Sequence, residues 1–160
     1  MELVLIGGVS GSGKSVALAA LEDAGYDTIG NLPVALVVPT VDHLAHASEE
    51  SRVAIALDAK GEPGLPGIGA TIDELKARGW NVRFVFLDTK VETLVKRFSE
   101  TRRRHPFSSD TRTLTEAIEY ERSLLAEARA LGFAFDTSDL SAAALRGWIK
   151  DFIAVDPSKL

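Results

Sequence analysis

The eight residues at positions 8–15 constrain this chain more than any other stretch, because they read G-x-x-x-x-G-K-S. An apolar run at residues 3–6 precedes them, and a helix-forming segment at residues 16–24 follows them. A strand, a loop and a helix in this order are the context that a phosphate-binding loop requires. The glycines of the loop let backbone N–H groups approach a polyphosphate closely. The stretch therefore predicts a nucleoside triphosphate site at the end of the first strand.

The residues of this loop are expected to have different roles. Lys14 would contact the β- and γ-phosphates, and the hydroxyl of Ser15 would bind Mg²⁺. The expected binding set is the whole loop, namely Gly8, Val9, Ser10, Gly11, Ser12, Gly13, Lys14 and Ser15. A glycine-rich turn that binds nothing is the alternative. The Lys-Ser pair and the flanking elements argue against it.

A second informative stretch is residues 52–58, in which an apolar run at 53–57 is followed by Asp58. An apolar strand followed by Asp is typical of a Walker B element, whose carboxylate holds Mg²⁺ directly or through water. An Asp that only caps a turn is the other interpretation. A similar run ends in Asp88, which makes Asp88 a rival for the metal role. We rank it lower, because Asp88 could serve as the N-cap of the helix that follows.

Arginine is concentrated at residues 97–112, although the chain is acidic overall, with a net charge of −5. The arginine side chain is suited to forked contacts with phosphate oxygens. Because consecutive side chains point in different directions around a helix, we expect Arg102 or Arg103 to face the nucleotide, and not every arginine of the segment. A solvated helix end is the alternative, since the helix dipole favours cations there.

Strand-like and helix-like segments alternate along the chain and predict its fold class. Strands are expected at residues 3–6, 26–29, 52–58, 82–88 and 133–138, and loops at 30–33, 60–69 and 108–113. Helices are expected at residues 16–24, 34–48 (with the helix proper beginning at Pro39 or Thr40), 71–78, 91–103, 114–131 and 140–155. This order predicts an α/β, three-layer P-loop NTPase fold with a mainly parallel five-stranded sheet. We expect one nucleotide-binding domain at residues 1–155 and a frayed tail at 156–160.

The composition limits the cellular compartment and the classes of partner that we expect for the protein. The chain has no cysteine, which excludes disulfides and thiolate metal sites. No apolar run approaches the ~20 residues needed to cross a bilayer, and no basic leader is visible. We therefore expect a soluble, cytoplasmic protein that does not bind membranes. The negative net charge argues against binding nucleic acid through bulk electrostatics, so an RNA-binding module that uses the same arginines ranks low.

Several motifs together resemble the RapZ/YvcJ family of P-loop nucleotide-binding proteins. They are residues 8–23, Gly25-Tyr26 leading to Asn31-Leu32-Pro33, Phe86-Leu87-Asp88, residues 97–106 with their Thr-Arg-Arg-Arg-His-Pro sequence, and Asp136-Thr137-Ser138. The resemblance implies binding of ATP and GTP with slow hydrolysis, in the regulatory half of an RNase adapter. It also implies a guanine-nucleotide site at Asp58, Ala59, Lys60 and Gly61. This chain keeps the Asp of the family's Asp-x-Arg-Asn element, has Lys60 for the Arg and lacks the Asn.

Two further departures from the family pattern carry expectations. The family usually has Asp where this chain has Gly30, so we expect weakened hydrolysis. Family proteins also continue into a second domain to which RNA or metabolite recognition is attributed. An RNA or protein partner would therefore act through a domain absent from this chain.

Two functions remain open from the sequence. The first is a Mg²⁺-dependent ATP/GTP-binding domain with weak NTPase activity, in which Lys14, Asp58, Arg102 and Arg103 carry the chemistry. The second is a small-molecule or nucleotide kinase, whose residues 97–112 would form an arginine-bearing lid that closes over the acceptor and excludes water. The sequence leaves the oligomeric state open.

Overall fold

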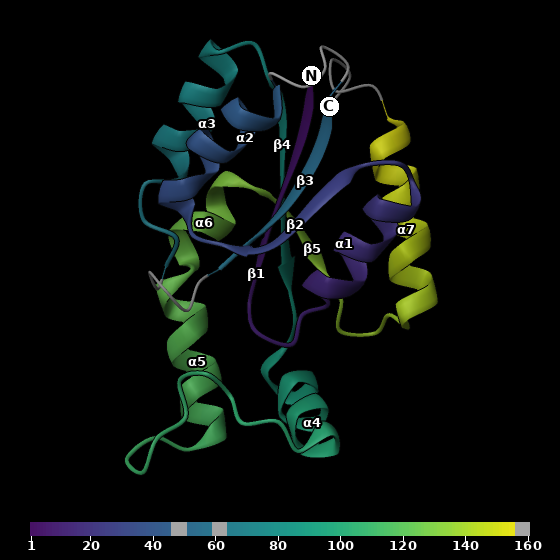
Figure 1. Cartoon of the computed structure of the whole chain (residues 1–160). Coiled ribbons are helices and arrows are strands. Elements are labelled where there is room, and N and C mark those ends of the chain that lie inside the picture. The colour runs from purple at the N-terminus through teal and green to yellow at the C-terminus, as the bar shows by residue number, and fades with distance from the viewer. Residues whose placement is uncertain (46–50, 59–63, 156–160) are drawn as a thin grey trace.

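The computed structural model describes residues 1–45, 51–58 and 64–155. Within these residues, five strands form one sheet in the order β2-β3-β1-β4-β5, and every neighbouring pair is parallel (Figure 1). The strands are β1 Glu2–Gly8, β2 Asp27–Leu32, β3 Arg52–Leu57, β4 Asn81–Asp88 and β5 Phe133–Asp136. The predicted five-stranded parallel sheet is confirmed.

The three central strands are buried, as their continuous apolar runs require in a parallel sheet. Leu5 of β1 lies beside Ile55 of β3 on one side and beside Phe84 of β4 on the other. Because parallel strands all end at the same edge, the residues at the ends of β1, β3 and β4 meet at that edge. These are the predicted phosphate loop after β1, Asp58 after β3 and Asp88 at the end of β4.

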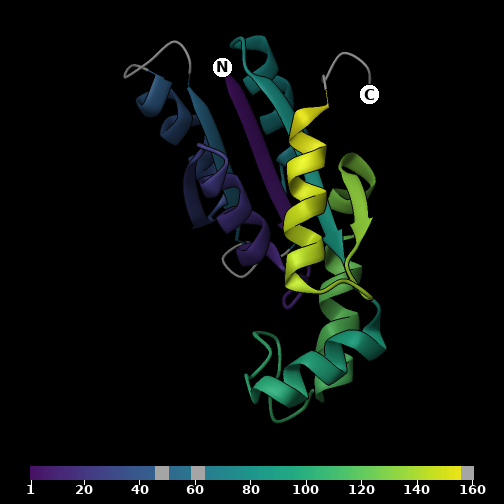
Figure 2. The same cartoon turned by 90° about the vertical axis from the view of Figure 1, so that its right-hand side faces the viewer.

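Helices cover both faces of the sheet, which gives three layers (Figures 1 and 2). Helices α1 Lys14–Asp23 and α7 Ala142–Ala154 lie on one face, and α2 Val37–Ala45, α3 Ile68–Ala77 and α6 Ala126–Leu131 lie on the other. Alternate residues of β1 serve the two cores: Val4 and Ile6 pack toward α1 and α7, whereas Leu3 and Leu5 belong to the opposite core. None of the described helices combines the length and apolarity needed to span a bilayer.

Helices α4 Val91–Thr101 and α5 Leu114–Leu124 extend beyond the edge of the sheet where the strands end (Figure 1). We call residues 91–124 the arm. It holds an aromatic series that runs from the buried Phe98 and His105 to the exposed Tyr120. The ring centroids of Phe98 and His105 lie 5.0 Å apart, those of His105 and Phe107 5.9 Å, and those of Phe107 and Tyr120 5.6 Å. The arm therefore has packing of its own. It carries the arginine-rich residues 97–112, which we call the basic segment, beside the strand ends.

Some predicted boundaries are wrong for local reasons. Residues 30–32, expected as loop, continue β2, because a register shift and a left-handed Asn31 (φ 56°) absorb the irregularity. Helix α2 begins at Val37, preceded by the 3₁₀ turn η1 Val34–Leu36, since a helix tolerates Pro39 in its first turn. Helix α3 begins at Ile68, within the segment expected as loop.

The long helix expected at residues 114–131 is also wrong. It is divided into α5 and α6 at Leu125, whose φ of −92° and ψ of 4° interrupt the helix. The tail expected at 156–160 lies outside the described residues.

Candidate functional site

The loop at residues 8–15 joins β1 to α1 at the edge where the strands end. Gly13 directly precedes α1 with φ 106°, and Gly11 has φ 85°, both in the left-handed region that favours glycine. Within the described part of the chain, the N–H groups of Gly11 and Gly13 donate to no other residue. The first N–H groups of α1 also lack intrahelical acceptors. An anion in front of the loop would receive all of these donors.

Lys14 reaches back across this loop from the start of α1. Its Nζ donates to the carbonyl oxygen of Gly8 at 2.9 Å. Burial lowers the pKa of Lys14, while the nearby carboxylates of Glu121 and Asp58 act in the opposite direction. An ammonium group has three donors, so Lys14 retains hydrogen-bonding capacity for a phosphate.

Ser10 contacts a residue that no motif in the sequence marks. Its backbone N–H donates to Glu121 Oε1 at 2.6 Å, and its hydroxyl donates to Glu121 Oε2 at 2.6 Å. Glu121 belongs to α5 and is only 2% exposed. The sequence held one signal, since Glu121 stands four residues after Ala117 and four before Leu125, within the otherwise apolar stripe of the helix.

His105, which belongs to the basic segment, also contacts Glu121. Its Nδ1 accepts the N–H of Phe107 at 3.1 Å, so the ring proton is on Nε2, which lies 3.4 Å from Glu121 Oε1. Burial alone would raise the pKa of Glu121, but the close contact with His105 and the hydrogen bonds from Ser10 together hold this pKa below its ordinary value. An ionised carboxylate therefore links the arm to the phosphate loop.

Arg97 of α4 fixes the other side of the loop. Its Nη1 donates to the carbonyl of Gly11 at 2.9 Å, and its Nη2 donates to the carbonyl of Thr137 at 2.8 Å. The hydroxyl of Thr137 in turn donates to the carbonyl of Ser12 at 2.7 Å. A cavity of about 230 Å³ opens beside these groups, and its walls include Gly13, Val16, Arg97, Thr137, Leu140 and Leu145.

Ser15 and Asp58 are the predicted metal ligands. Ser15 is exposed at the start of α1, and Asp58 is half-buried directly after β3, near enough to act on the pKa of Lys14. A hydroxyl and one carboxylate, joined by phosphate oxygens and water, are the donor set that Mg²⁺ prefers. These two residues therefore fit the ion. The other members of the expected guanine site, Ala59, Lys60 and Gly61, lie outside the described residues.

Asp88, the rival for the metal role, is engaged by arginines. Its Oδ2 lies 3.0 Å from Arg129 Nε and 3.4 Å from Arg122 Nη2, and its Oδ1 accepts the N–H of Thr89 at 2.9 Å. The expectation that Asp88 caps the next helix is wrong, because Lys90 is the N-cap of α4. Two neighbouring cations leave this carboxylate poorly placed to attract a metal ion.

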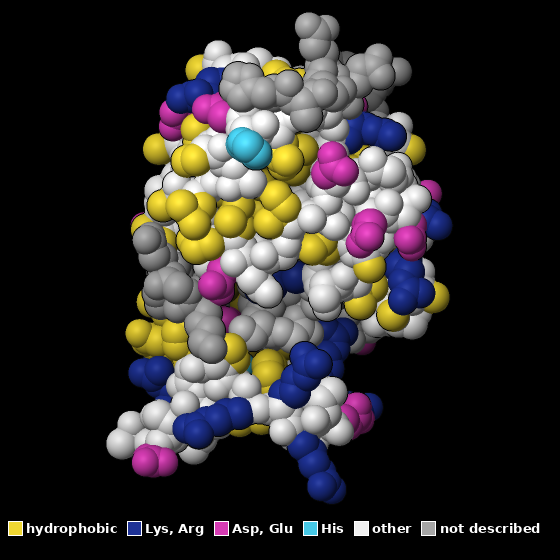
Figure 3. All heavy atoms as spheres, viewed as in Figure 1, with side chains coloured by type: hydrophobic (Ala, Val, Ile, Leu, Met, Phe, Trp, Pro, Cys, Tyr) yellow, Lys and Arg dark blue, Asp and Glu magenta, His cyan; other side chains and the backbone are white. Residues whose placement is uncertain are grey.

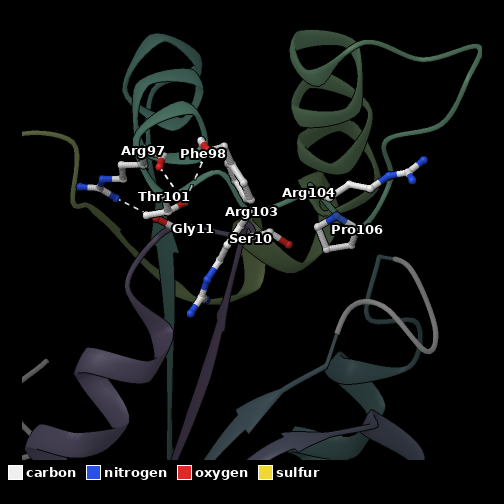
Figure 4. Close-up of a pocket in the computed structure, with 8 residues that line it drawn as sticks. All are labelled: Ser10, Gly11, Arg97, Phe98, Thr101, Arg103, Arg104 and Pro106. Carbon is white, nitrogen blue, oxygen red and sulfur yellow. Dashed lines mark hydrogen bonds between the residues drawn. The ribbon is translucent and has the colours of Figure 1, made fainter.

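The two arginines predicted to face the nucleotide lie where α4 ends. Arg102 follows the last turn with a left-handed φ of 55° and is exposed. Arg103 lines a second cavity of about 660 Å³, together with Ser10 and Gly11 of the loop. Figure 4 shows the side chain of Arg103 on the loop side of the arm and that of Arg104 directed away from it. Of the expected pair, Arg103 is the one beside the loop.

Comparison with known proteins identifies the family. A sequence model of the RapZ-like N-terminal domain matches residues 1–157. The chain belongs to the RapZ-like family. A curated "Nucleotide-binding protein" of Thiobacillus denitrificans is 50% identical to the RapZ-like domain over 160 residues, which make up 100% of this chain and 57% of the relative. Another of the same name, from Methylobacillus flagellatus, is 50% identical over 153 residues, covering 96% of this chain and 54% of the relative. The chain thus spans little more than half the length of these relatives.

Solved structures support the P-loop fold of the RapZ-like domain. The YorR protein of Bacillus subtilis, in complex with phosphorylated GDP, superposes with a TM-score of 0.62 at 16% identity, covering 95% of each chain. Shikimate kinase of Acinetobacter baumannii, in complex with shikimate, gives a TM-score of 0.59 at 16% identity, covering 96% of this chain and 92% of the kinase. At this level of identity the likeness shows the fold alone. It confirms the predicted α/β, three-layer class.

Proposed function

We propose that this RapZ-like domain binds a Mg²⁺-nucleoside triphosphate, ATP or GTP, at residues 8–15 and hydrolyses it slowly, as the regulatory part of a longer RNase adapter. The observation that carries the proposal is the loop itself, in which the N–H groups of Gly11 and Gly13 donate to no other described residue and the ammonium group of Lys14 contacts the carbonyl of Gly8. The names of the curated relatives support nucleotide binding. The absence of cysteine fits a reducing compartment, so a cytoplasmic location is part of the proposal.

The triphosphate would lie across the start of α1. Lys14 would neutralise the β- and γ-phosphates, and the positive end of the helix dipole would add to the attraction. Ser15 and Asp58 would hold Mg²⁺, which supplies charge neutralisation between the two terminal phosphates when bound. Arg103 is the arginine best placed to reach the γ-phosphate, because it lies beside Ser10 and Gly11.

The base would occupy the cavity of about 230 Å³ on the other side of Arg97. Val16, Leu140 and Leu145 give this cavity an apolar wall. The guanidinium of Arg97 is fixed by two carbonyls, so it offers a planar cation on which a base can stack. These features accept either the adenine of ATP or the guanine of GTP.

Slow hydrolysis is expected because neither of two positions near the loop offers a carboxylate that could activate a water molecule. Gly30, exposed on β2, offers no side chain to orient a water molecule. Glu121 is already engaged by Ser10 and His105. With Asp58 assigned to Mg²⁺, neither Gly30 nor Glu121 supplies a general base, and a site of this kind stabilises the bound nucleotide more than the transition state.

A kinase that acts on a small molecule or a nucleotide is the second candidate. The observation that favours it is the cavity of about 660 Å³ between the loop and the arm, where an acceptor could lie. The two functions separate in one assay. ADP release is measured with ATP and Mg²⁺ alone, and then with a panel of nucleoside monophosphates and sugars. A low rate that no acceptor raises supports the regulatory NTPase, whereas strong stimulation by one acceptor overturns it in favour of a kinase.

A further inference from the structure

The larger cavity, of about 660 Å³, is a separate compartment with walls from three parts of the chain. Its size falls in the range of sites for small organic ligands. The loop forms one wall, α4 the second, and the segment after α4 the third. Among its lining residues are Ser10, Gly11, Phe98, Thr101, Arg103 and Pro106 (Figure 4).

The described residues bring charge of one sign to these walls. Among them the cavity is lined by no carboxylate, and Arg103 forms no hydrogen bond or ion pair with any other residue that the structure describes. Arg97 and Arg104 also line the cavity, and both donate hydrogen bonds to backbone carbonyls. Because a carbonyl is neutral, these bonds do not compensate the positive charge of the two arginines. Lys and Arg side chains gather over the arm in the space-filling view (Figure 3). Such a cavity selects an anion, and guanidinium groups favour phosphate oxygens.

The cavity is larger than a bare phosphate requires, and part of its wall is apolar. Phe98 is packed against His105, with the ring centroids 5.0 Å apart, so its ring is held in place. Pro106 provides a second rigid apolar surface, and Thr101 adds a hydroxyl at the end of α4. The ligand that fits these walls carries an uncharged organic group beside its phosphate.

The position of the cavity distinguishes it from the expected nucleotide compartment. Arg97 and Gly11 belong to the walls of both cavities, so the loop tip stands between them. The base of a nucleotide would lie on the α1 and α7 side, where Val16 and Leu145 are, and the larger cavity lies on the side of the arm. Two ligands could therefore bind at once, with their phosphates approaching the same loop.

We propose that this cavity binds a second ligand, a small phosphomonoester that carries an organic group. Nucleoside monophosphates and sugar phosphates share this chemistry. The proposal rests on the proposed function, because it assigns the triphosphate to the loop and the smaller cavity. It adds a binding site whose arginine, Arg103, would be shared between the second ligand and the γ-phosphate.

The test is calorimetry on the whole chain saturated with Mg²⁺ and a non-hydrolysable ATP analogue. Inorganic phosphate, AMP and ribose 5-phosphate are titrated separately into the loaded protein and into the empty protein. We expect one equivalent of AMP or ribose 5-phosphate to bind the loaded protein, more tightly than inorganic phosphate, because only the organic esters reach the apolar wall. The two esters distinguish a nucleotide from a sugar source.

Variants locate the binding. Arg103→Gln removes the free cation and should weaken the ester at least about tenfold, the effect of losing a charged hydrogen bond. Thr101→Trp fills the cavity from an exposed position and should abolish ester binding. Arg146→Gln, an identical charge change at an exposed position of α7, is the control and should bind the ester as the parent does. Thermal unfolding of each variant checks that it is folded.

Each contrary result has a distinct meaning. If the chain binds the ATP analogue but none of the probes, the second site is overturned and the nucleotide site stands. If the analogue itself fails to bind, the proposed function fails, and ester binding that Thr101→Trp removes would still support the cavity. Equal ester binding in all variants, or displacement of the analogue by the ester, overturns the second site. Binding of single-stranded RNA without any ester binding overturns it in favour of a nucleic-acid surface.

Discussion

Glu121 and Ser10 are joined by two hydrogen bonds of 2.6 Å each, although they stand 111 positions apart in the chain. One carboxylate thereby receives both donors that Ser10 offers to its surroundings. Because Glu121 is also paired with His105, this contact holds the phosphate loop, α5 and the basic segment together. Any change at Glu121 should therefore affect the loop and the arm at once.

Replacement of Glu121 by Gln should destabilise the protein. The amide keeps the shape of the side chain but can accept through one oxygen only, so one donor of Ser10 faces an N–H₂ group in a buried place. The expected loss in the free energy of unfolding is about 1–3 kcal/mol, the cost of a buried donor left unpaired. Chemical denaturation measures it. Glu119→Gln, an exposed change on the same helix, is the control, and equal stability of the two variants would contradict the role of Glu121.

The same contact predicts a dependence of stability on pH. The pKa of Glu121 is lower in the folded protein than its ordinary value of 4.5. A carboxyl with a lowered pKa stabilises the fold fully above its unfolded value, and this contribution is lost as the pH falls through the folded value. The stability difference between the parent and Glu121→Gln should therefore shrink below about pH 4.5. Denaturation midpoints at a series of pH values test this, and a constant or widening difference would be inconsistent with an ionised Glu121.

The loop should be intolerant of a side chain at Gly13. This residue has φ 106°, and a Cβ there would lie 2.7 Å from Leu145 Cδ2. We expect Gly13→Ala to cost about 2–4 kcal/mol, from the left-handed backbone and from overpacking together. The double variant with Leu145→Ala shows whether removing the clash offsets the cavity that it leaves.

Gly147→Ala is the matched control for Gly13, because a Cβ at position 147 would meet no atom within 4 Å. In the middle of α7, this change should be neutral or stabilising. A loss of stability at position 147 as large as that at position 13 would show that the loop has no special requirement for glycine.

A carboxylate at position 30 should raise the rate of hydrolysis. Gly30 has no left-handed φ, and a Cβ there would meet only Leu18 Cδ2, at an ordinary 3.6 Å, so Asp can be introduced without strain. Gly30→Asp would supply the acidic group whose absence we connect with slow turnover. Phosphate release from ATP under saturating Mg²⁺ is the measurement, and Gly30→Ala is the control. A rate for Gly30→Asp no higher than for Gly30→Ala would count against this explanation.

The sequence predicts the fold well because its signals are local. The apolar runs of β1, β3 and β4 and the glycines of the loop act over a few neighbouring residues, and they were sufficient for the order of elements and for a parallel sheet. The element ends were less predictable. Leu125 divides a segment whose apolar periodicity predicts one continuous helix. Pro39 was predicted to begin the second helix, but it lies inside the first turn of α2, which begins at Val37.

The site was only partly accessible from the sequence for a different reason. Lys14 and Ser15 belong to a contiguous motif, so spacing alone marks them. Glu121 acquires its role when α5 packs against the loop, and its sequence neighbourhood is that of an ordinary amphipathic helix. Likewise, Arg103 and not Arg102 lies beside the loop because α4 ends at Thr101. The run of three arginines gives no sequence signal for that helix end.

The central claim is that the loop at residues 8–15 binds a nucleoside triphosphate through Lys14. It is tested most directly by calorimetric titration of a non-hydrolysable ATP or GTP analogue with Mg²⁺ into the parent, Lys14→Ala and the control Lys150→Ala, an exposed change on α7. The account predicts saturable binding to the parent and to Lys150→Ala, and an affinity at least about tenfold weaker for Lys14→Ala, the loss of a charged hydrogen bond to phosphate. Equal affinity of all three proteins, or no binding to the parent, would contradict it.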